Sequence, residues 1–235
     1  FGPSGSGKTY SALRIASGLG AKIAVIDSER GSASKYSDKF EFDTVDLESK
    51  TIDEYVDMLK EAAKEGYEVV IIDSLSHGWQ ELLEEVDKLT KAKYKGNSWS
   101  AWSEGTPKQR KLIDAIIDYP GHVIATMRSK TEWVQEKDER SGRTKPVRVG
   151  LSPEQGKGIE YEFDMLFEIN PDHYCTIIKD RTGGDFQDKI IQYPDESLGQ
   201  HIKEWLCSGK VPEKKRPKAS PQFLTAMEQL KEKVG

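Results

Sequence analysis

A glycine-rich octapeptide, Gly2-Pro3-Ser4-Gly5-Ser6-Gly7-Lys8-Thr9, fits the phosphate-binding pattern G-x-x-x-x-G-K-[ST] without a mismatch. Glycines let the backbone N–H groups of such a loop approach phosphate oxygens, and the positive end of a following helix adds to the attraction. In this pattern Lys8 reaches the β- and γ-phosphates, and the hydroxyl of Thr9 binds Mg²⁺. A flexible Gly/Ser loop is the alternative, but it does not require Lys-Thr after the last glycine. We therefore predict a site for ATP and Mg²⁺ that extends from the octapeptide to Tyr10.

Two acidic residues each follow a short apolar run of the kind that forms buried parallel strands. The run at residues 23–26 leads into Asp27-Ser28-Glu29, and the run at residues 69–72 leads into Asp73. Glu29 is placed to take a proton from water attacking the γ-phosphate, and we predict that it is the general base. Asp73 is predicted to hold Mg²⁺ from the side opposite Thr9. A solvated loop and a strand that merely ends in Asp are the alternatives, and the phosphate loop upstream favours the catalytic interpretation.

Helical and strand patterns alternate along the chain. Helical periodicity covers residues 8–19, 52–63, 75–93 and, after a predicted start at Thr106-Pro107, a segment that ends at Ile117. Short apolar runs predict strands at residues 22–27, 69–74, 121–127, 163–169 and 174–178, with a weaker edge strand at residues 40–45. This alternation predicts an α/β fold with a mostly parallel central sheet flanked by helices and antiparallel strands toward the C-terminal side. Only Phe1 precedes the phosphate loop, so we expect the first strand of the sheet to be missing from the sequence.

Length and composition predict one soluble domain with a tail. The 235 residues are 36% hydrophobic and 32% charged, enough for one core and too polar for a membrane span. The net charge of −5 confines any polyanion site to a local patch. Two cysteines without metal or redox spacing indicate reduced thiols of an intracellular, cytoplasmic protein. We expect a core at residues 1–207, a Lys/Pro-rich linker at 208–220 and a short helix at 221–235, whose apolar face docks on the core or on a partner protein.

A segment that mixes lysines with aromatic residues follows the helix at residues 75–93. Its candidate contacts to single-stranded DNA are Lys93, Lys95, Trp99 and Trp102. Lysines neutralise phosphates and aromatic faces stack on any base, so the mixture suits single-stranded nucleic acid. A surface loop whose two tryptophans pack inward is an equally good interpretation of the residues alone.

A second basic segment lacks an apolar period and has a turn at Ser141-Gly142 between two extended arms. Its candidate DNA contacts are Arg128, Lys130, Arg140, Arg143, Lys145 and Arg148. Acidic residues interrupt these cations, so a solvated hairpin with balanced charges is the alternative.

Three short motifs resemble RecA-type recombinases. Ile26-Asp27-Ser28-Glu29 resembles the strand end that carries their catalytic glutamate, Asp73-Ser74 resembles their second nucleotide motif, and residues 158–164 lie where they close the second DNA loop. The chain is most similar to the short RecA-like ATPases that phages encode as single-strand annealing or recombination proteins, over most of residues 1–206. The resemblance implies a RecA-like P-loop NTPase core, a phage protein acting in a bacterial host, and DNA loops around Trp99 and at residues 128–155.

The resemblance also implies that Lys179 and Arg181 act on the nucleotide of a neighbouring subunit in a ring or filament. A carboxylate-binding surface pair is the interpretation that the two residues alone would favour. Where RecA proteins have an Asn-Gln pair that senses the γ-phosphate, this chain has Thr126-Met127-Arg128, so sensing has been lost or has moved to Arg128.

Two functions remain open from the sequence. The first is an ATP-dependent recombination protein that binds single-stranded DNA and promotes annealing or strand exchange as a homo-oligomer, with a single-strand DNA-binding protein as a further partner for the C-terminal segment. The second is a nucleotide-gated ATPase that acts on a protein partner.

Overall fold

A computed structural model describes residues 1–137 and 144–209, and the side chains among these outside residues 132–149. The predicted C-terminal helix and nearly all of the predicted linker lie outside the described residues. The chain divides into two compact units, Phe1–Lys203 and Glu204–Gly235, and the sites discussed below lie in the first.

The central sheet contains four parallel strands in the order β2-β1-β3-β4. These strands are β1 (Ile23–Asp27), β2 (Asp43–Asp46), β3 (Val69–Asp73) and β4 (His122–Ala125). Every residue of β1 and β3 is buried, as expected for parallel strands covered on both faces. The register pairs Asp27 with Asp73, so the two acidic ends lie side by side at one edge of the sheet.

The phosphate loop continues the sheet beyond β4. Gly2 forms a parallel bridge with Arg128, and its N–H donates to Met127 O at 3.3 Å. On the other flank Ile169 N donates to Phe1 O at 2.8 Å. Phe1 and Gly2 therefore lie between the segment after β4 and strand β7 (Met165–Ile169).

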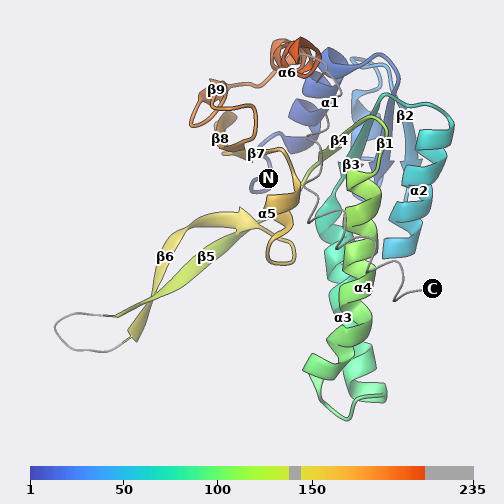
Figure 1. Cartoon of the computed structure of the whole chain (residues 1–235), viewed down its shortest axis with the longest axis vertical. Coiled ribbons are helices and arrows are strands. Elements are labelled where there is room, and N and C mark those ends of the chain that lie inside the picture. Colours follow the sequence, from blue (N-terminus) through green and yellow to red (C-terminus); the bar gives the residue numbers. More distant parts are fainter. Residues whose placement is uncertain (138–143, 210–235) are drawn as a thin grey trace, which may run out of the picture. The chain divides into compact units, whose positions relative to one another are not determined.

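Helices cover both faces of the sheet (Figure 1). They are α1 (Lys8–Leu19), α2 (Ile52–Lys64), α3 (Leu75–Ala92) and α4 (Ser98–Ile117), with a 3₁₀ turn at Ala33–Tyr36. Alternate residues of β1, β3 and β4 enter separate cores, because successive side chains of a strand point to opposite faces. Ile72 of β3 packs with α2, α3 and α4, whereas Ile71 packs with α1.

Antiparallel elements follow the parallel sheet, as predicted. Strands β5 (Ser129–Lys137) and β6 (Thr144–Pro153) form a two-stranded hairpin, and β7 is joined by β8 (Tyr174–Asp180) and β9 (Ile190–Gln192). Two helices complete the described chain, α5 (Ile159–Glu162) and α6 (Glu196–Ser208). Together with the parallel sheet these elements confirm the α/β fold class.

The prediction that a helix begins at Thr106-Pro107 is wrong. Helix α4 begins at Ser98, and the side chain of Asn97 caps it by accepting a hydrogen bond from Ser100 N at 3.1 Å. Pro107 lies inside the helix, a position that normally breaks it. Packing against α3 compensates: a Cβ at Gly105 would lie only 2.6 Å from Val86 Cγ2, so the glycine allows close approach.

Candidate nucleotide site

The phosphate loop has the backbone that its sequence predicts. Gly5 and Gly7 have positive φ angles of 78° and 84°, which side chains rarely tolerate, and α1 begins at Lys8 directly after them. A Cβ at Gly2 would lie 2.2 Å from Ile169 O, so glycine is needed for the loop to sit against β7. The loop therefore has the tight turns of a phosphate cradle.

Lys8 curls back over this loop. Its Nζ donates to Gly2 O at 3.0 Å and to Pro3 O at 2.8 Å. Burial lowers the pKa of Lys8, because desolvation disfavours the ammonium. An anion in the cradle would give this ammonium a charged partner, which fits a triphosphate.

The two predicted metal ligands meet. The hydroxyl of Thr9 donates to Asp73 Oδ2 at 2.7 Å, and the hydroxyl of Thr126 donates to Asp73 Oδ1. Asp73 is buried, and this burial raises its pKa, with nearby Asp27 and Glu29 acting in the same direction. A buried carboxylate among other acids beside a hydroxyl is a donor set that suits Mg²⁺, so the residues fit the ion.

The predicted general base lies at the same edge of the sheet. The guanidinium of Arg128 donates to the carboxylate of Glu29, from Nη2 at 2.9 and 3.0 Å and from Nε at 3.2 Å. Ser74 Oγ lies 3.4 Å from the same carboxylate. The sequence suggested Arg128 as a DNA contact or as a sensor of the γ-phosphate. The structure shows that Arg128 also contacts the predicted base directly.

A family comparison agrees with this geometry. A family model described as an AAA domain matches residues 1–196. The chain belongs to this family. No curated protein matches the chain. The AAA domain is an ATPase-type P-loop domain, which supports binding and hydrolysis of nucleotide as its general activity.

Sequence reasoning missed His77 of this AAA domain. Its Nδ1 lies 2.8 Å from Ser28 Oγ, and its Nε2 lies 3.6 Å from Glu29 Oε1. Burial lowers the pKa of His77, which favours the neutral imidazole. Its position gave a usable signal, because the first turn of a helix that follows Asp73 must lie near the carboxyl ends of β1 and β3.

The turn between β7 and β8 was also missed. His173, with a positive φ of 62°, places Nδ1 3.0 Å from the carbonyl of Ser6 in the phosphate loop. Its ring lies 5.4 Å from that of Tyr193. The signal was the polar turn that ends a strand parallel to the loop, since loops at that edge contact ligands in open α/β sheets.

Tyr10, the last residue predicted to contact the nucleotide, lies in an aromatic cluster. Its ring meets Tyr36 and Phe40 edge to face, each with centroids 5.4 Å apart. The cluster packs the start of α1 against the segment that follows Glu29.

Lys179 and Arg181 both bind their own chain. Lys179 Nζ donates to the carbonyls of Glu160, Tyr161 and Phe163 at 2.7, 2.9 and 2.6 Å. Arg181 donates to Asp164 Oδ1 at 3.1 Å and to the carbonyl of Tyr161. The pair therefore holds the end of α5, and a role across a subunit boundary stays a prediction.

The first predicted DNA segment forms the connection between α3 and α4 and the start of α4. Trp99 is 86% exposed, whereas Trp102 stacks on Trp79 with centroids 5.6 Å apart and packs against the core. Lys93 pairs with Glu104 at 2.8 Å, and Lys95 is exposed. The two tryptophans thus divide between the two interpretations that the sequence left open, because Trp79 covers one face of Trp102.

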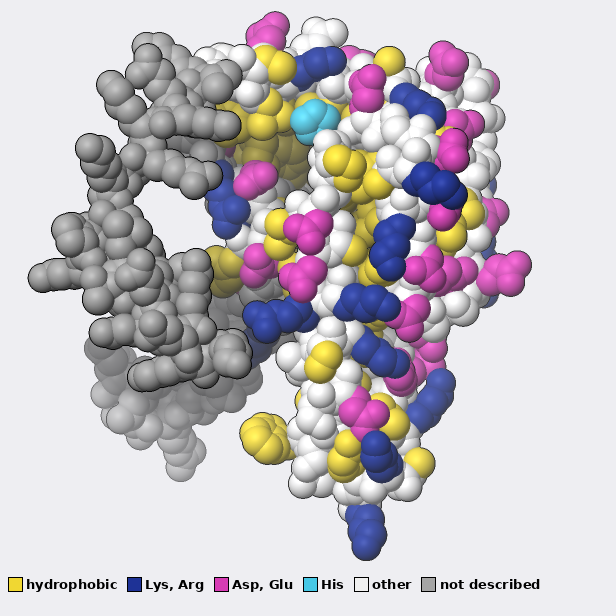
Figure 2. Space-filling model, turned by 45° about the vertical axis from the view of Figure 1, so that its right-hand side comes forward, with side chains coloured by type: hydrophobic (Ala, Val, Ile, Leu, Met, Phe, Trp, Pro, Cys, Tyr) yellow, Lys and Arg dark blue, Asp and Glu magenta, His cyan; other side chains and the backbone are white. Residues whose placement is uncertain are grey.

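Charges of both signs cover the neighbouring helices. Figure 2 shows dark blue and magenta side chains intermixed over α3 and α4. Lys91 pairs with Asp87, and Lys108 pairs with Glu85. This face therefore offers few uncompensated cations to a polyanion.

The second DNA segment is the β5–β6 hairpin. Lys130 donates to the carbonyl of Gln155 at 3.3 Å. Arg140 and Arg143 lie outside the described residues. Lys145 and Arg148 lie on β6, and the structure describes their backbone but not their side chains. Their contacts with DNA stay predictions.

Three further features of the described residues concern metal ligands, helix hydrophobicity and thiols. Within residues 1–137 and 144–209 no group of three or more His, Cys, Asp or Glu side chains is arranged to hold a metal. Over the same residues no helix has the length and apolarity needed to cross a bilayer. Cys175 is buried and Cys207 is exposed, both as free thiols.

Proposed function

We propose that this AAA domain hydrolyses ATP within a DNA recombination protein that binds single-stranded DNA and promotes annealing or strand exchange as an oligomer. One observation carries the proposal. Both segments predicted to bind DNA are joined to residues of the nucleotide site: β5 follows Arg128 directly, and the segment around Trp99 is connected to Asp73 through α3, which begins one residue after Asp73. A ligand on either segment would act on elements that begin at the site of hydrolysis.

The chemistry is divided among four side chains. Lys8 is proposed to bind the β- and γ-phosphates once they replace the carbonyls of Gly2 and Pro3. Glu29 is proposed as the general base, because it follows by two residues Asp27, which pairs with Asp73 at the strand ends. Thr9 and Asp73 would hold Mg²⁺, which neutralises phosphate charge when bound.

Trp99 and Lys95 support the DNA part of this proposal. An exposed indole is a stacking surface for bases, and an exposed lysine beside it attracts phosphate. The paired charges over α3 and α4 restrict this contact to the turn between the helices. We therefore place base stacking at Trp99 and phosphate contacts on the hairpin.

ATP hydrolysis with and without oligothymidylate tests the proposal, with Lys8→Ala as the background. DNA should raise the rate, and binding measured by fluorescence anisotropy should weaken steeply as salt rises. Trp99→Ala should weaken binding, while Ile117→Ala, which removes an exposed apolar side chain at the other end of α4, should not. Salt-independent binding or an unchanged rate would contradict a DNA role.

A protein partner is the second candidate. The alternating charges of α3 and α4 favour it, because a surface with both signs resembles a polar protein interface more than a DNA groove. An ATPase rate that does not respond to DNA, together with intact hydrolysis, would support this alternative.

A further inference from the structure

The guanidinium of Arg128 binds the carboxylate of Glu29, the group that is proposed to accept a proton from water. Arg128 Nη2 contacts both oxygens of Glu29, at 2.9 and 3.0 Å, and Nε adds a contact to Oε1 at 3.2 Å. The side chain of Arg128 is 41% exposed and that of Glu29 is 29% exposed. The guanidinium is therefore accessible to another anion from solvent.

Oε1 of Glu29 has little acceptor capacity left in this arrangement, whereas Oε2 has a single contact. Oε1 faces two guanidinium nitrogens and the hydroxyl of Ser74, and Oε2 faces the third contact. A general base must direct a lone pair at the water that it activates. With Arg128 in place, Glu29 is held by the guanidinium instead of being aimed at water.

The backbone of Arg128 is fixed even though its side chain is exposed. Its N–H donates to Ser76 Oγ at 2.9 Å, and its carbonyl accepts from Glu154 N at 2.7 Å. Gly2 of the phosphate loop bridges the same residue. Only the guanidinium can therefore exchange partners without disturbing the loop.

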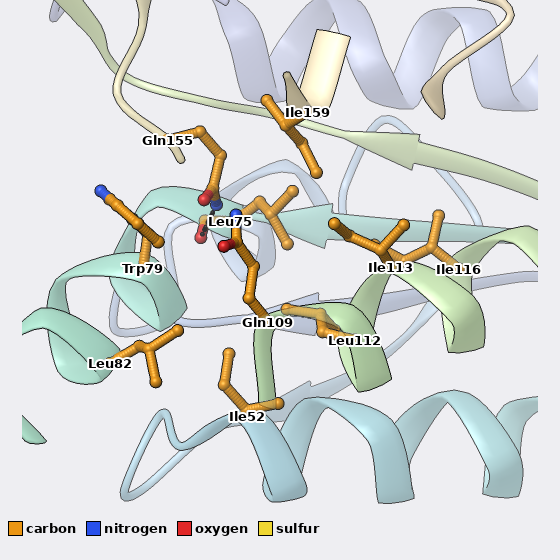
Figure 3. A pocket seen from close by; sticks show the side chains of 10 residues that line it. All are labelled: Ile52, Leu75, Trp79, Leu82, Gln109, Leu112, Ile113, Ile116, Gln155 and Ile159. Carbon is orange, nitrogen blue, oxygen red and sulfur yellow. Dashed lines mark hydrogen bonds between the residues drawn. The ribbon is translucent and has the colours of Figure 1, made fainter. Parts of the chain in front are cut away.

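The other end of the hairpin contacts the same helix. Gln155 Nε2 donates to the carbonyl of Leu75, and both residues line a small pocket between α2, α3 and α4 (Figure 3). A Cβ at Gly156 would lie 2.1 Å from Gln109 Nε2, so the chain after β6 is seated tightly on α4. Both ends of the hairpin are thus anchored beside the helix that follows Asp73.

We propose that Arg128 is a positioning residue that holds Glu29 away from the attacking water. A phosphate oxyanion that binds the guanidinium in place of Glu29 releases the carboxylate. The proposal rests on the proposed function, which makes Glu29 the base and the hairpin a polyanion site. A guanidinium binds phosphate with the same two-pronged geometry that it uses for carboxylate, so a nucleic-acid phosphate at the foot of the hairpin can replace Glu29.

His77 gives the released carboxylate a second partner. Its Nε2 already lies 3.6 Å from Glu29 Oε1, and its Nδ1 is 2.8 Å from Ser28 Oγ. The single hydrogen of the Ser28 hydroxyl can go to Nδ1 or to the carbonyl of Ser74, 3.0 Å away. With that hydrogen on Nδ1, the neutral ring carries its own hydrogen on Nε2 and can donate to one oxygen of Glu29. The other oxygen then remains free for water.

Removal of the guanidinium tests this proposal. In Arg128→Gln the rate without DNA should rise on the order of tenfold, because the charge-assisted hydrogen bonds no longer have to break. KM for ATP should stay unchanged, and stimulation by oligothymidylate should disappear. Arg128→Lys, which keeps the charge but loses the planar fork, should show an intermediate rate. The double variant Glu29→Gln/Arg128→Gln should show no rise, since the gain acts through Glu29.

Arg14→Gln is the matched control. It removes a comparable fork, in which Arg14 Nε contacts the two oxygens of Glu196 at 2.9 and 3.0 Å, outside the nucleotide site. Its rate without DNA should equal that of the wild type.

Two results would overturn the proposal. A fall in kcat with a rise in KM in both Arg128 variants would mean that the guanidinium binds the γ-phosphate of ATP itself. An unchanged rate without DNA in both variants would show that Arg128 does not withhold Glu29. Neither result depends on DNA binding, whereas a wild-type protein that binds no oligothymidylate would refute the proposed function instead.

Discussion

Thr9 and Asp73, 64 residues apart in the chain, share a hydrogen bond of 2.7 Å from the hydroxyl to Oδ2. This contact joins the first turn of α1 to the end of β3. It also sets the distance between the two groups that are proposed to hold Mg²⁺. The two ligands are therefore pre-positioned by the fold.

Thr9→Val should raise the Mg²⁺ concentration needed for half-maximal ATPase activity by at least about tenfold, because valine has the same shape and no hydroxyl. Thr9→Ser keeps the hydroxyl and should remain close to the wild type. Titration of Mg²⁺ at fixed ATP measures both variants. Equal requirements in the valine and serine variants would remove Thr9 from the metal site.

Glu29→Gln should lower turnover by about a hundredfold or more while ATP binding persists, since the amide keeps the shape of the side chain and loses the base. Binding can be followed by equilibrium dialysis and turnover by phosphate release. Glu41→Gln, at an exposed position, is the control. Wild-type turnover in Glu29→Gln would rule out this glutamate as the base.

Mixing variants tests whether Arg181 acts on a neighbouring subunit. Arg181→Ala should bind ATP and hydrolyse it poorly, and Lys8→Ala should not bind it. A mixture should regain activity, because the Lys8 variant still supplies Arg181 to its neighbour. Absence of rescue, together with specific activity that is flat on dilution, would leave Arg181 with its observed partners Asp164 and Tyr161.

The two tryptophans should behave differently on truncation. Trp99→Ala should weaken single-strand binding by roughly tenfold without lowering the melting temperature, because its ring is exposed. Trp102→Ala should lower the free energy of unfolding by about 2 kcal/mol or more, since it loses the stack on Trp79. Thermal melts and anisotropy on both proteins separate the effects, and the reverse pattern would contradict them.

Cys175 should resist alkylation in the native protein. Burial raises the pKa of its thiol to about 11, so the reactive thiolate is scarce at pH 8, and exposed Cys207 should react first. The raised pKa also means that the stability contributed by the protonated thiol is fully present below the unfolded pKa and is lost as pH rises through about 11. Iodoacetamide labelling followed by mass spectrometry measures the two rates, and equal rates would contradict the burial.

Local patterns predicted the parts of the fold in which local rules and packing agree. The apolar runs at residues 23–26 and 69–72 became β1 and β3, since buried parallel strands need continuous apolar sequence. The helix predicted from residue 52 also begins there, because the Thr51 side chain caps it by accepting from Glu54 N. At Pro107 the rules disagreed, and packing of Gly105 against Val86 outweighed the local preference for a helix start.

The candidate site was predicted where a motif covers it and missed where it depends on long-range contacts. Glycine spacing identified Lys8 and Thr9, because the loop acts mainly through its own backbone. The contact between Arg128 and Glu29 spans 99 residues and leaves no periodic pattern in the chain. Nor did the composition around Trp99 and Trp102 indicate which ring would find a buried partner, since that depends on Trp79 in another helix.

The segments that flank Phe1 and Gly2 in the folded protein are synthesised much later than these two residues. Their hydrogen-bonding partners include Met127, Phe167 and Ile169, which leave the ribosome long after the phosphate loop does. At about 5–20 residues per second, the delay between Gly2 and Ile169 is roughly ten to thirty seconds. During that time the glycine-rich loop lacks one neighbouring strand, so a nascent chain halted after β6 should be unable to retain nucleotide.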